Sequence, residues 1–360
     1  MGIKNLHQFL KKKCPQVYQT VSLNKFKHKT IAVDLSIYLF KYKIVFGNKW
    51  LDAFLYLIAN MNEKYINLIF VYDTKSPPEK EMERKLRSEA RAKLRAKLEK
   101  IRNIWDDIRP KDKNIDDFVV PEIEDHVFMQ FINRQVSVNN TVSIRMVEEE
   151  IQKIENSLTY ISSIDFGVTK SLFNACGIPT IDAEGEAEAT CAALNRNNIV
   201  TGVLTDDTDV LAYATPLMIY KLNFEEHTCI EINYEYLLQE LGLNREAFLD
   251  FCIMCGTDYN QTISRIGCER AFKLIQEYGS IENIGLYNPN IATDVLNYKR
   301  IREIFYYQLK DDNITIHETK LPNNNELVEF CFKNNCHFDI RRIIKDLKTE
   351  QPRTKHVRVL

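Results

Sequence analysis

The sequence lacks any apolar run of about eighteen residues, the length that a membrane-spanning helix requires. Charged residues interrupt its first positions, MGIKNLHQFLKKKCPQ, so we expect no secretory signal peptide. The nine cysteines lack the spacing of a disulfide framework, and no internal repeat or low-complexity block is present. We therefore expect a globular protein of a reducing, intracellular compartment, without a membrane partner.

Acidic residues are scarce in two parts of the chain, although its net charge is only −2. Residues 1–50 contain ten lysines and a single acid, Asp34, and residues 75–113 contain fourteen Lys or Arg against eight Asp or Glu. For any one such segment, a solvated surface of mixed charge is a sufficient explanation. Two basic segments and a separate concentration of acids favour a protein that binds a polyanion with one surface and cations with another.

Short apolar runs rich in β-branched residues alternate with helical patterns as far as about residue 225. This alternation predicts an α/β fold in which a central, mainly parallel twisted sheet is flanked by helices. Beyond residue 225 the pattern is helical, and residues 349–360 are expected to form a flexible basic tail. The expected buried strands span residues 30–33, 67–72, 199–204 and 217–222.

Acidic residues follow three of these strands at the point where each strand ends. Ligand sites of open parallel sheets lie outside the carboxyl ends of the strands, so we expect the acids to share one edge. A single Asp after a strand is more often the N-cap residue of the next helix than a ligand, so Asp34 alone would not indicate a binding site. The acids are the strand-end residues Asp34, Asp73, Asp206, Asp207 and Asp209, and the pair Glu186 and Glu188 at the start of the expected helix GEAEATCAAL.

A cluster of carboxylates without His or Cys suits a hard cation such as Mg²⁺ or Mn²⁺. Two such ions a few ångströms apart can activate a water molecule and stabilise the leaving oxygen of a phosphodiester. Beside strongly basic segments, the cluster favours phosphodiester hydrolysis on nucleic acid. The residues alone leave two alternatives open, a phosphatase and a purely structural metal site.

Residues 77–109 form a long helical pattern that carries much of the positive charge. Its apolar residues recur at spacings of four and three, which marks one stripe for packing. The remaining faces are cationic, as on a solvated amphipathic helix, but they would also guide a single nucleic-acid strand. The stripe consists of Leu94, Leu98, Ile101, Trp105 and Ile108.

Six motifs, in their order along the chain, resemble the structure-specific 5′ nucleases, the family of flap endonuclease, the related 5′ exonucleases and XPG-type repair nucleases. The motifs are MGIKNLHQFL, IAVDLS, FVYDTKSPPEK, GIPTIDAEGEAEATCAAL, VLTDDTDVLAY and CGTDYNQTISRIGCERAFKLIQEYGSIENI. The resemblance implies a PIN-like 5′-nuclease fold in a single domain, residues 1–348. Its expected parts are an N-region (1–105), a helical arch with an insertion (77–160), an I-region (161–260), a helix–two-turn–helix element (256–285) and C-terminal helices to residue 348.

The resemblance implies that seven acids bind two Mg²⁺ ions, for which Mn²⁺ can substitute. One of them, Asp258 in GTDY, follows an expected helix, so the strand-end pattern does not include it. Asp206 corresponds to a family position that is acidic without being a principal ligand. The implied ligands are Asp34, Asp73, Glu186, Glu188, Asp207, Asp209 and Asp258.

Basic residues near the start of the long helix resemble those that steer the scissile phosphate towards the metal ions. They are Lys80 with either Arg84 or Arg87. The helix would then belong to an arch through which a single-stranded 5′ end passes. The chain between Asp73 and Glu186 is longer than in typical flap endonucleases, which implies an enlarged arch or an insertion near residues 108–145.

The resemblance also implies contacts with the substrate at the N-terminal end of the chain. Gly2 corresponds to a glycine that approaches DNA closely once the initiator methionine is removed. An aromatic residue near the site usually stacks on a base, and Tyr38 or Phe40 is the candidate. Core packing of either ring is an equally open interpretation.

The segment GTDYNQTISRIGCERA resembles the helix–two-turn–helix element that holds duplex DNA by its phosphates, often with a K⁺ ion bound by carbonyl oxygens. Gly267 and Arg270 are the expected DNA contacts. The family usually shows Gly-Ile-Gly-Pro-Lys-Arg where this chain has Arg-Ile-Gly-Cys-Glu-Arg, so a glycine, a proline and a lysine are replaced. Thr74 likewise replaces a glycine. The replacements in the helix–two-turn–helix segment bear on K⁺ binding and on the strength of the duplex grip.

These features predict a Mg²⁺-dependent nuclease that cleaves branched or flapped DNA near junctions of single and double strands, in replication, repair or recombination. One alternative is a mainly 5′–3′ exonuclease of the same family. Another is a junction-binding protein with vestigial catalysis, against which the presence of all seven acids weighs. No sliding-clamp docking box is found at the C-terminus, and we expect a monomer at a nuclear or cytoplasmic replication site, or in a virus factory for a divergent viral relative.

Overall fold

The computed structural model describes residues 2–110, 117–121, 123–135, 141–307, 315–317 and 323–347. The predicted tail at 349–360 and part of the predicted insertion lie outside these described residues. Within the described ranges, none of the helices combines the length and the apolar character needed to cross a bilayer.

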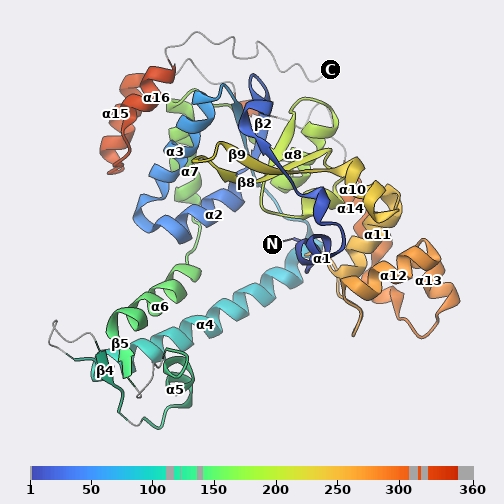
Figure 1. Cartoon of the computed structure of the whole chain (residues 1–360), viewed down its shortest axis with the longest axis horizontal. Coiled ribbons are helices and arrows are strands. Elements are labelled where there is room, and N and C mark those ends of the chain that lie inside the picture. Colours follow the sequence, from blue (N-terminus) through green and yellow to red (C-terminus); the bar gives the residue numbers. More distant parts are fainter. Residues whose placement is uncertain are drawn as a thin grey trace.

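An eight-stranded sheet forms the centre of the molecule (Figure 1), and its five middle strands are parallel. In spatial order, these strands are β8 (Leu217–Asn223), β7 (Gly202–Leu204), β2 (Thr30–Asp34), β3 (Asn67–Tyr72) and β6 (Thr180–Asp182). The outer strands each pair antiparallel with their inner neighbour: β9 (Thr228–Asn233) with β8, β1 (Gln19–Ser22) with β9, and β10 (Thr315–His317) with β6. The predicted mainly parallel sheet is confirmed.

The middle strands are apolar throughout because helices cover both faces of the sheet. In β2, Ala32 packs into the core on one face, while Ile31 and Val33 pack into the core on the other. The core on the first face includes residues of α1 (Leu6–Lys13), α8 (Ala187–Arg196), α9 (Asp209–Ala212), α10 (Tyr234–Leu241), α11 (Arg245–Cys255), α12 (Cys268–Tyr278), α13 (Ile281–Tyr287) and α14 (Tyr298–Phe305), of which α12 packs on α1 and α11 and α13 packs on α12. The second is covered by α2 (Leu35–Phe46), α3 (Trp50–Glu63), α7 (Ser163–Ala175), α15 (Asn324–Lys333) and α16 (Ile340–Leu347).

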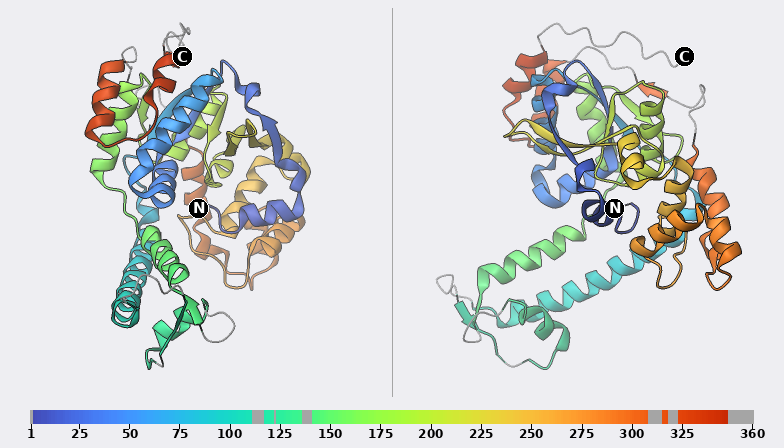
Figure 2. Two further views of the ribbon diagram at one scale, coloured as in Figure 1. Left: turned by 60° about the vertical axis from the view of Figure 1, so that its left-hand side comes forward. Right: turned by 45° about the vertical axis from the view of Figure 1, so that its right-hand side comes forward.

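A helical unit extends away from this three-layer body (Figures 1 and 2). Its longest element, α4, spans 28 residues and is therefore about 42 Å long. Leu98, Ile101 and Trp105 of α4 are buried in a separate small core, which confirms the predicted apolar stripe. We call residues 81–157 the projecting unit; it consists of α4 (Glu81–Ile108), β4 (Asp117–Val119), α5 (His126–Ile132), β5 (Thr141–Ser143) and α6 (Ile144–Ser157).

The sequence pattern missed four strands of the central sheet, namely β1, β6, β9 and β10. Strand β1 is largely exposed and lies at an edge of the sheet, so it has no apolar run. Strand β6 has only three residues, too few to show a period. The strand predicted from residue 199 begins at Gly202, because the preceding residues connect it to α8.

Candidate metal centre

The parallel strands bring the predicted acids to one edge of the sheet. Strand β2 ends at Asp34, Asp73 directly follows β3, and the segment 205–209 directly follows β7. These three strands are neighbours in the order β7, β2, β3, so their carboxyl ends are adjacent. Glu186 is the N-cap residue of α8 and Glu188 lies in its first turn, while Asp258 follows α11.

Thr205 organises the loop after β7. Its hydroxyl donates to Asp34 Oδ2 at 3.3 Å and accepts the backbone N–H of Asp207 at 3.1 Å. Asp207 Oδ1 in turn accepts the N–H of Asp209 at 2.9 Å. These bonds fold the loop tightly and hold the carboxylate of Asp207 close to Asp34.

Lys80 lies among the acids that come from the other side of the site. Its ammonium group is 2.5 Å from Glu186 Oε1, 3.6 Å from Asp258 Oδ2 and 3.9 Å from Glu188 Oε1. Burial alone would lower the pKa of Lys80, but Glu188, Glu186 and Asp258 outweigh that effect and raise it. Lys80 therefore stays protonated and is a counter-charge within the cluster.

The structure distinguishes the two candidate arginines on α4. Arg87 donates from Nη2 to Asp258 Oδ2 at 2.9 Å and also pairs with Glu83. Arg84 is exposed, and within the described part of the chain its side chain forms no hydrogen bond or ion pair. Arg87 is thus the arginine that reaches the carboxylates.

Several of the acids are almost completely buried, which is unusual for carboxylates. Asp34, Glu188 and Asp209 are 2%, 7% and 1% exposed. Burial is the main reason that the pKa of each carboxyl is raised well above its usual range, and the neighbouring carboxylates raise it further. Lys80 offsets only part of this repulsion, so the cluster favours additional positive charge.

Asp73 differs from the other acids because it is exposed. Its Oδ1 accepts the N–H of Ala187 at 2.6 Å, and its Oδ2 accepts the hydroxyl of Ser36. The first of these bonds joins the end of β3 to the start of α8, close to Glu186 and Glu188.

The chemistry of the donors fits a hard divalent cation, since all seven side chains offer oxygen. Asp34 Oδ1 and both side-chain oxygens of Asp209 are buried without a hydrogen-bond partner in the described part of the chain. As the side chains stand, however, no three His, Cys, Asp or Glu of the described residues form a group that could hold a metal ion. Because Lys80 lies within 4.0 Å of three of the acids, cation binding requires it to move or share them.

Gly2 touches the same cluster. A Cβ atom on this residue would lie 2.0 Å from Asp207 Oδ1 and 2.9 Å from the backbone nitrogen of Asp209. Its φ of +85° is also one that side-chain-bearing residues rarely adopt. Only glycine fits here without displacing two of the acids.

Comparison with known proteins identifies the family. The model of the XPG N-terminal domain matches residues 1–94, and that of the XPG I-region matches residues 177–258. The probable RAD2-like endonuclease 369L of Invertebrate iridescent virus 6 is 33% identical over 349 residues, which cover 88% of this chain and 82% of that protein. The chain belongs to the XPG family of nucleases.

Further members of the XPG family agree in sequence and in fold. Flap endonuclease 1 of Cryptosporidium parvum is 28% identical over 369 residues, covering 92% of this chain and 67% of that protein. The catalytic core of Rad2 in complex with DNA substrate superposes with a TM-score of 0.59 at 20% identity, covering 96% of this chain and all of that chain. At that identity the superposition establishes the fold alone.

One predicted substrate contact of the XPG-family site needs correction. Tyr38 is 3% exposed and its ring packs edge-on against Tyr42 in the core, so it cannot stack on a base in this structure. The core interpretation is therefore the right one for Tyr38. Phe40 is partly exposed, and the guanidinium of Arg91 lies over its ring at 5.9 Å.

The two residues expected to grip duplex DNA lie on α12, apart from the carboxylates. Gly267 is the N-cap residue of this helix and Arg270 is in its first turn, and both are exposed. Cys268, which stands where the XPG family has proline, donates its thiol to the backbone oxygen of Lys4 at 3.0 Å. This bond ties α12 to the segment that carries Gly2.

Sequence reasoning missed two tyrosines that support Glu186. The hydroxyl of Tyr259 donates to Glu186 Oε2, and Tyr213 Oη lies 3.2 Å from Tyr259 Oη. Both rings are buried. Tyr259 directly follows Asp258, and that adjacency was the only available sign, whereas nothing in the local pattern indicated Tyr213.

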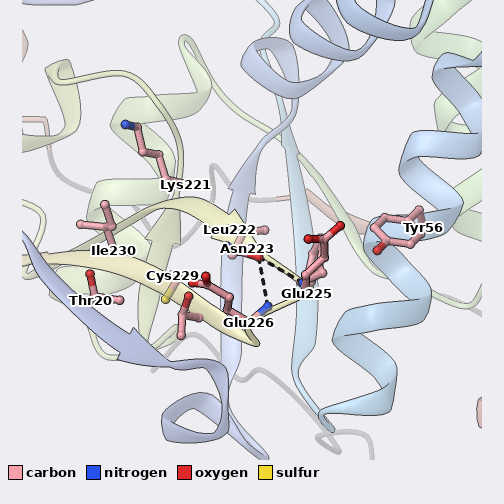
Figure 3. A pocket seen from close by; sticks show the side chains of 11 residues that line it. Thr20, Tyr56, Lys221, Leu222, Asn223, Glu225, Glu226, Cys229 and Ile230 are labelled. Carbon is pink, nitrogen blue, oxygen red and sulfur yellow. Dashed lines mark hydrogen bonds between the residues drawn. The ribbon is translucent and has the colours of Figure 1, made fainter.

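An open recess of the described molecule lies away from the carboxylates (Figure 3). It measures about 530 Å³ and lies between α3 and the hairpin of β8 and β9, with Tyr56 on one side and Lys221, Asn223 and Glu226 on the other. None of the seven acids lines it. This recess therefore contains none of the residues expected to carry the chemistry of this XPG-family member.

Proposed function

We propose that this protein is a Mg²⁺-dependent, structure-specific DNA nuclease that hydrolyses a phosphodiester of the 5′ strand near a junction of single and double strands. The observation that carries the proposal is the convergence of seven acids, from separate segments, on one largely buried cluster at the base of a long basic helix. The name of the related flap endonuclease supports the choice of substrate.

The residues that would hold two Mg²⁺ ions, or Mn²⁺ in their place, are those of the cluster. When bound, such ions supply an activated water and stabilise the charge on the leaving oxygen. The unpartnered oxygens of Asp34 and Asp209 are the strongest candidates for direct ligands, because burial without a partner is costly. The complete set is Asp34, Asp73, Glu186, Glu188, Asp207, Asp209 and Asp258.

Lys80 and Arg87 would bind the scissile phosphate. Both are cationic, and both already lie against carboxylates of the cluster. A phosphate that binds together with metal ions would replace the carboxylates as the hydrogen-bond acceptor of Lys80 and Arg87, because its oxygens accept several charge-assisted hydrogen bonds. Lys80 would keep its proton throughout and act by charge. Gly2, which leaves no side chain beside Asp207, would allow a strand to approach closely.

The projecting unit would form the arch of the nuclease. Its helix α4 starts beside the cluster at Lys80 and exposes a series of basic residues along its length, among them Arg84, Arg91 and Arg95. Such a surface attracts the phosphates of a single strand without regard to sequence. The Rad2 core that shares this fold was solved with a DNA substrate.

The turn between α11 and α12 would hold the duplex. The exposed N-terminal end of α12 at Gly267 offers backbone N–H groups to a phosphate, and Arg270 adds a positive charge. A K⁺ ion at this turn stays a prediction. To test it, the affinity for duplex DNA is compared in K⁺ and in Na⁺ at equal ionic strength. Equal affinity in the two salts would contradict K⁺ binding.

The deciding experiment compares two neighbouring acids that differ in role. Asp209→Asn removes a charge from the cluster, whereas Asp206→Asn removes one from a residue that pairs with Lys41 at 2.6 Å. We expect Asp209→Asn to reduce cleavage of a 5′-flap substrate at least about a thousandfold while flap binding is largely kept, since the loss is in transition-state charge stabilisation. Asp206→Asn should keep activity within a few-fold.

The assay uses flap, gap, nicked and single-stranded DNA with Mg²⁺, Mn²⁺ or a chelator. Cleavage that persists in chelator, or full activity of Asp209→Asn, would refute the metal-dependent assignment. Tight binding of flaps by the wild-type protein without any cleavage would replace the nuclease with a junction-binding protein. Blocking the free 5′ end of the flap with a bulky group tests whether the strand must thread through the arch.

A further inference from the structure

A second, smaller recess opens directly beside the carboxylate cluster. It measures about 240 Å³ and lies between α8, α14 and the segment that follows β3. Glu186 lines it and is at the same time part of the cluster, where it contacts Lys80. The walls are mainly apolar and come from Pro77, Ala189, Tyr213, Ile304 and Tyr307.

The walls of this recess are held in place by the surrounding structure. Arg196 donates to the backbone oxygens of Tyr213 and Tyr307, the latter at 2.6 Å, and so ties the two aromatic residues together. The ring of Tyr213 packs at 4.7 Å from that of Phe305. Ala189 and Gly185 keep the floor open because their side chains are small or absent. The recess is therefore formed before any ligand arrives.

Arg300 stands at the rim with a fixed orientation. Its Nε donates to Glu79 Oε1 at 2.6 Å, and its Nη1 donates to Glu303 Oε2 at 2.8 Å. A guanidinium has five N–H donors, so Nη2 can still donate to a ligand. Glu303 is more exposed than Arg300 and can accept from a ligand at the same rim.

The charges around the recess select a neutral ligand. Glu79 and Glu303 already neutralise Arg300, and Glu186 adds a further carboxylate next to Lys80. A phosphate placed here would meet a surplus of negative charge, so the recess is not an anion site. Its volume lies below the range of roughly 300–1,000 Å³ that drug-sized ligands occupy, which leaves room for one ring system.

We propose that this recess takes up a single unstacked nucleobase, that of the nucleotide beside the scissile phosphate. The inference rests on the proposed function, because it places that phosphate at the cluster that Glu186 shares with the recess. A base and its phosphate are separated by one sugar, so a strand bound at the cluster carries a base to the edge of the recess. Tyr307 and Ile304 offer surfaces for its ring, and Arg300 with Glu303 offers a donor and an acceptor for its edge.

The test couples a change in the protein to the removal of one base. Ile304→Trp fills the recess, and Lys299→Trp places the same side chain on an exposed position of the same helix. Flap substrates carry an abasic site at each of the nucleotides next to the cleavage position in turn. Dissociation constants are measured with Ca²⁺ in place of Mg²⁺, after a check that no product forms.

We expect one abasic position to weaken binding by the wild-type protein and by Lys299→Trp about fivefold to tenfold. The same abasic site should change the affinity of Ile304→Trp less than twofold, because the filled recess no longer holds the base. Arg300→Gln, which shortens the side chain and removes its charge, should reduce the abasic penalty in part, so that the test does not depend on one variant.

The proposal is overturned when no abasic position matters for the wild-type protein, or when Ile304→Trp and Arg300→Gln show the full wild-type penalty. Either result leaves the nuclease assignment intact, provided that the wild-type protein cleaves the unmodified flap in Mg²⁺. A wild-type protein that neither binds nor cleaves the unmodified flap refutes the proposed function itself, and the nucleobase site with it.

Discussion

At the scale of single residues, Lys80 competes with metal ions for the same oxygens. Its ammonium group lies within 4.0 Å of Glu186, Glu188 and Asp258. We predict that Lys80→Gln binds Mn²⁺ about tenfold more tightly in the absence of DNA, because a positive charge is removed from the neighbourhood of a cation site. The same variant should cleave flaps more slowly, since a phosphate ligand is lost.

Isothermal titration with Mn²⁺ measures the first effect and single-turnover cleavage the second. Lys41→Gln is the matched control, because Lys41 pairs with Asp206 outside the set of proposed ligands. Unchanged or weaker Mn²⁺ binding by Lys80→Gln would show that the lysine does not oppose the metal.

Gly2 provides a second prediction at this scale. In Gly2→Ala the added methyl group would lie 2.0 Å from Asp207 Oδ1, so either the N-terminal segment or the acid must move. We expect flap cleavage to fall about a hundredfold, as is typical when a reacting centre is misplaced by about 1 Å. Cleavage rate and thermal unfolding are measured together.

Gly242→Ala is the control for backbone strain alone. Gly242 has a φ of +64° and nothing within 4 Å of a Cβ atom. This variant should lose about 1 kcal/mol of stability and keep its activity. Equal loss of activity in both variants would mean that strain, and not the contact with Asp207, explains the effect of Gly2→Ala.

At the scale of helices, one buried charge network ties α11, α13 and α14 together. Arg302 on α14 donates to both oxygens of Asp250 on α11, at 2.7 and 2.6 Å, and to Glu282 on α13. Asp250 is 1% exposed and also accepts the N–H of Ile281 at 3.0 Å. Helix α11 precedes the turn of the proposed duplex grip, and α14 forms one wall of the small recess, so the network helps to position both.

We predict that Arg302→Met lowers the free energy of unfolding by about 3–5 kcal/mol, because it leaves a buried carboxylate without its partner. Burial already raises the pKa of Asp250, despite the opposing bonds from Arg302 and Ile281. A raised native pKa means that the folded state holds the proton more tightly than the unfolded state, so protonation relieves the destabilisation as the pH falls. The difference in the free energy of unfolding between wild type and Arg302→Met should therefore become smaller as the pH falls from neutral to mildly acidic.

Urea unfolding of wild type and Arg302→Met, at neutral and at mildly acidic pH, measures this difference in the free energy of unfolding. Arg300→Met is the control two positions away, because Arg300 is half exposed and its surface pairs contribute little. A gap that stays constant with pH, or an equal loss in Arg300→Met, would contradict the role given to the Asp250 network.

At the scale of the whole molecule, the separation of basic and acidic regions should appear as a salt dependence that differs between substrates. The projecting unit carries exposed Arg91 and Arg95 on the helix that leaves the cluster. We predict that Arg91→Gln with Arg95→Gln lowers the slope of log Kd against log salt by about 1–2 for flap DNA, one for each lost phosphate contact. The slope for nicked duplex without a flap should not change.

Fluorescence anisotropy across a salt series gives both slopes. Lys333→Gln with Arg341→Gln removes two exposed cations on α15 and α16, which lie on the other side of the body from the projecting unit (Figure 1), and serves as the control. Equal changes for flap and nicked duplex would show that the projecting unit is not a path for the single strand.

The sequence predicted the parts of the fold that are encoded locally. Strands β2, β3 and β8 are buried apolar runs, and their predicted limits agree with the structure within one residue. Strands β1 and β10 were not predicted, because short edge strands bury little and are defined by the neighbour with which they pair. The small core of the projecting unit was indicated only by the stripe on α4, because the sequence does not show which distant helices, here α5 and α6, pack against it.

The same distinction applies to the candidate site. The sequence placed Asp34, Asp73 and Asp207 at one sheet edge by parallel topology, and the structure brings them together. Their role as metal ligands stays a prediction. The hydrogen-bond partners of Glu186 and the burial of Tyr38 could not be predicted from the spacing of residues along the sequence, because both depend on residues distant in the chain.

By itself, the sequence determined the α/β class, the edge of the sheet at which acids gather and the basic character of α4, because period, composition and strand-end position are local properties. Only the tertiary structure decided which arginine reaches the acids. Arg84 and Arg87 both follow Lys80 at spacings that keep them on nearly the same side of α4, so spacing could not choose. Asp258 lies 171 residues further along the chain, so only the packing of the start of α4 beside this segment brings Arg87, and not Arg84, within 2.9 Å of it.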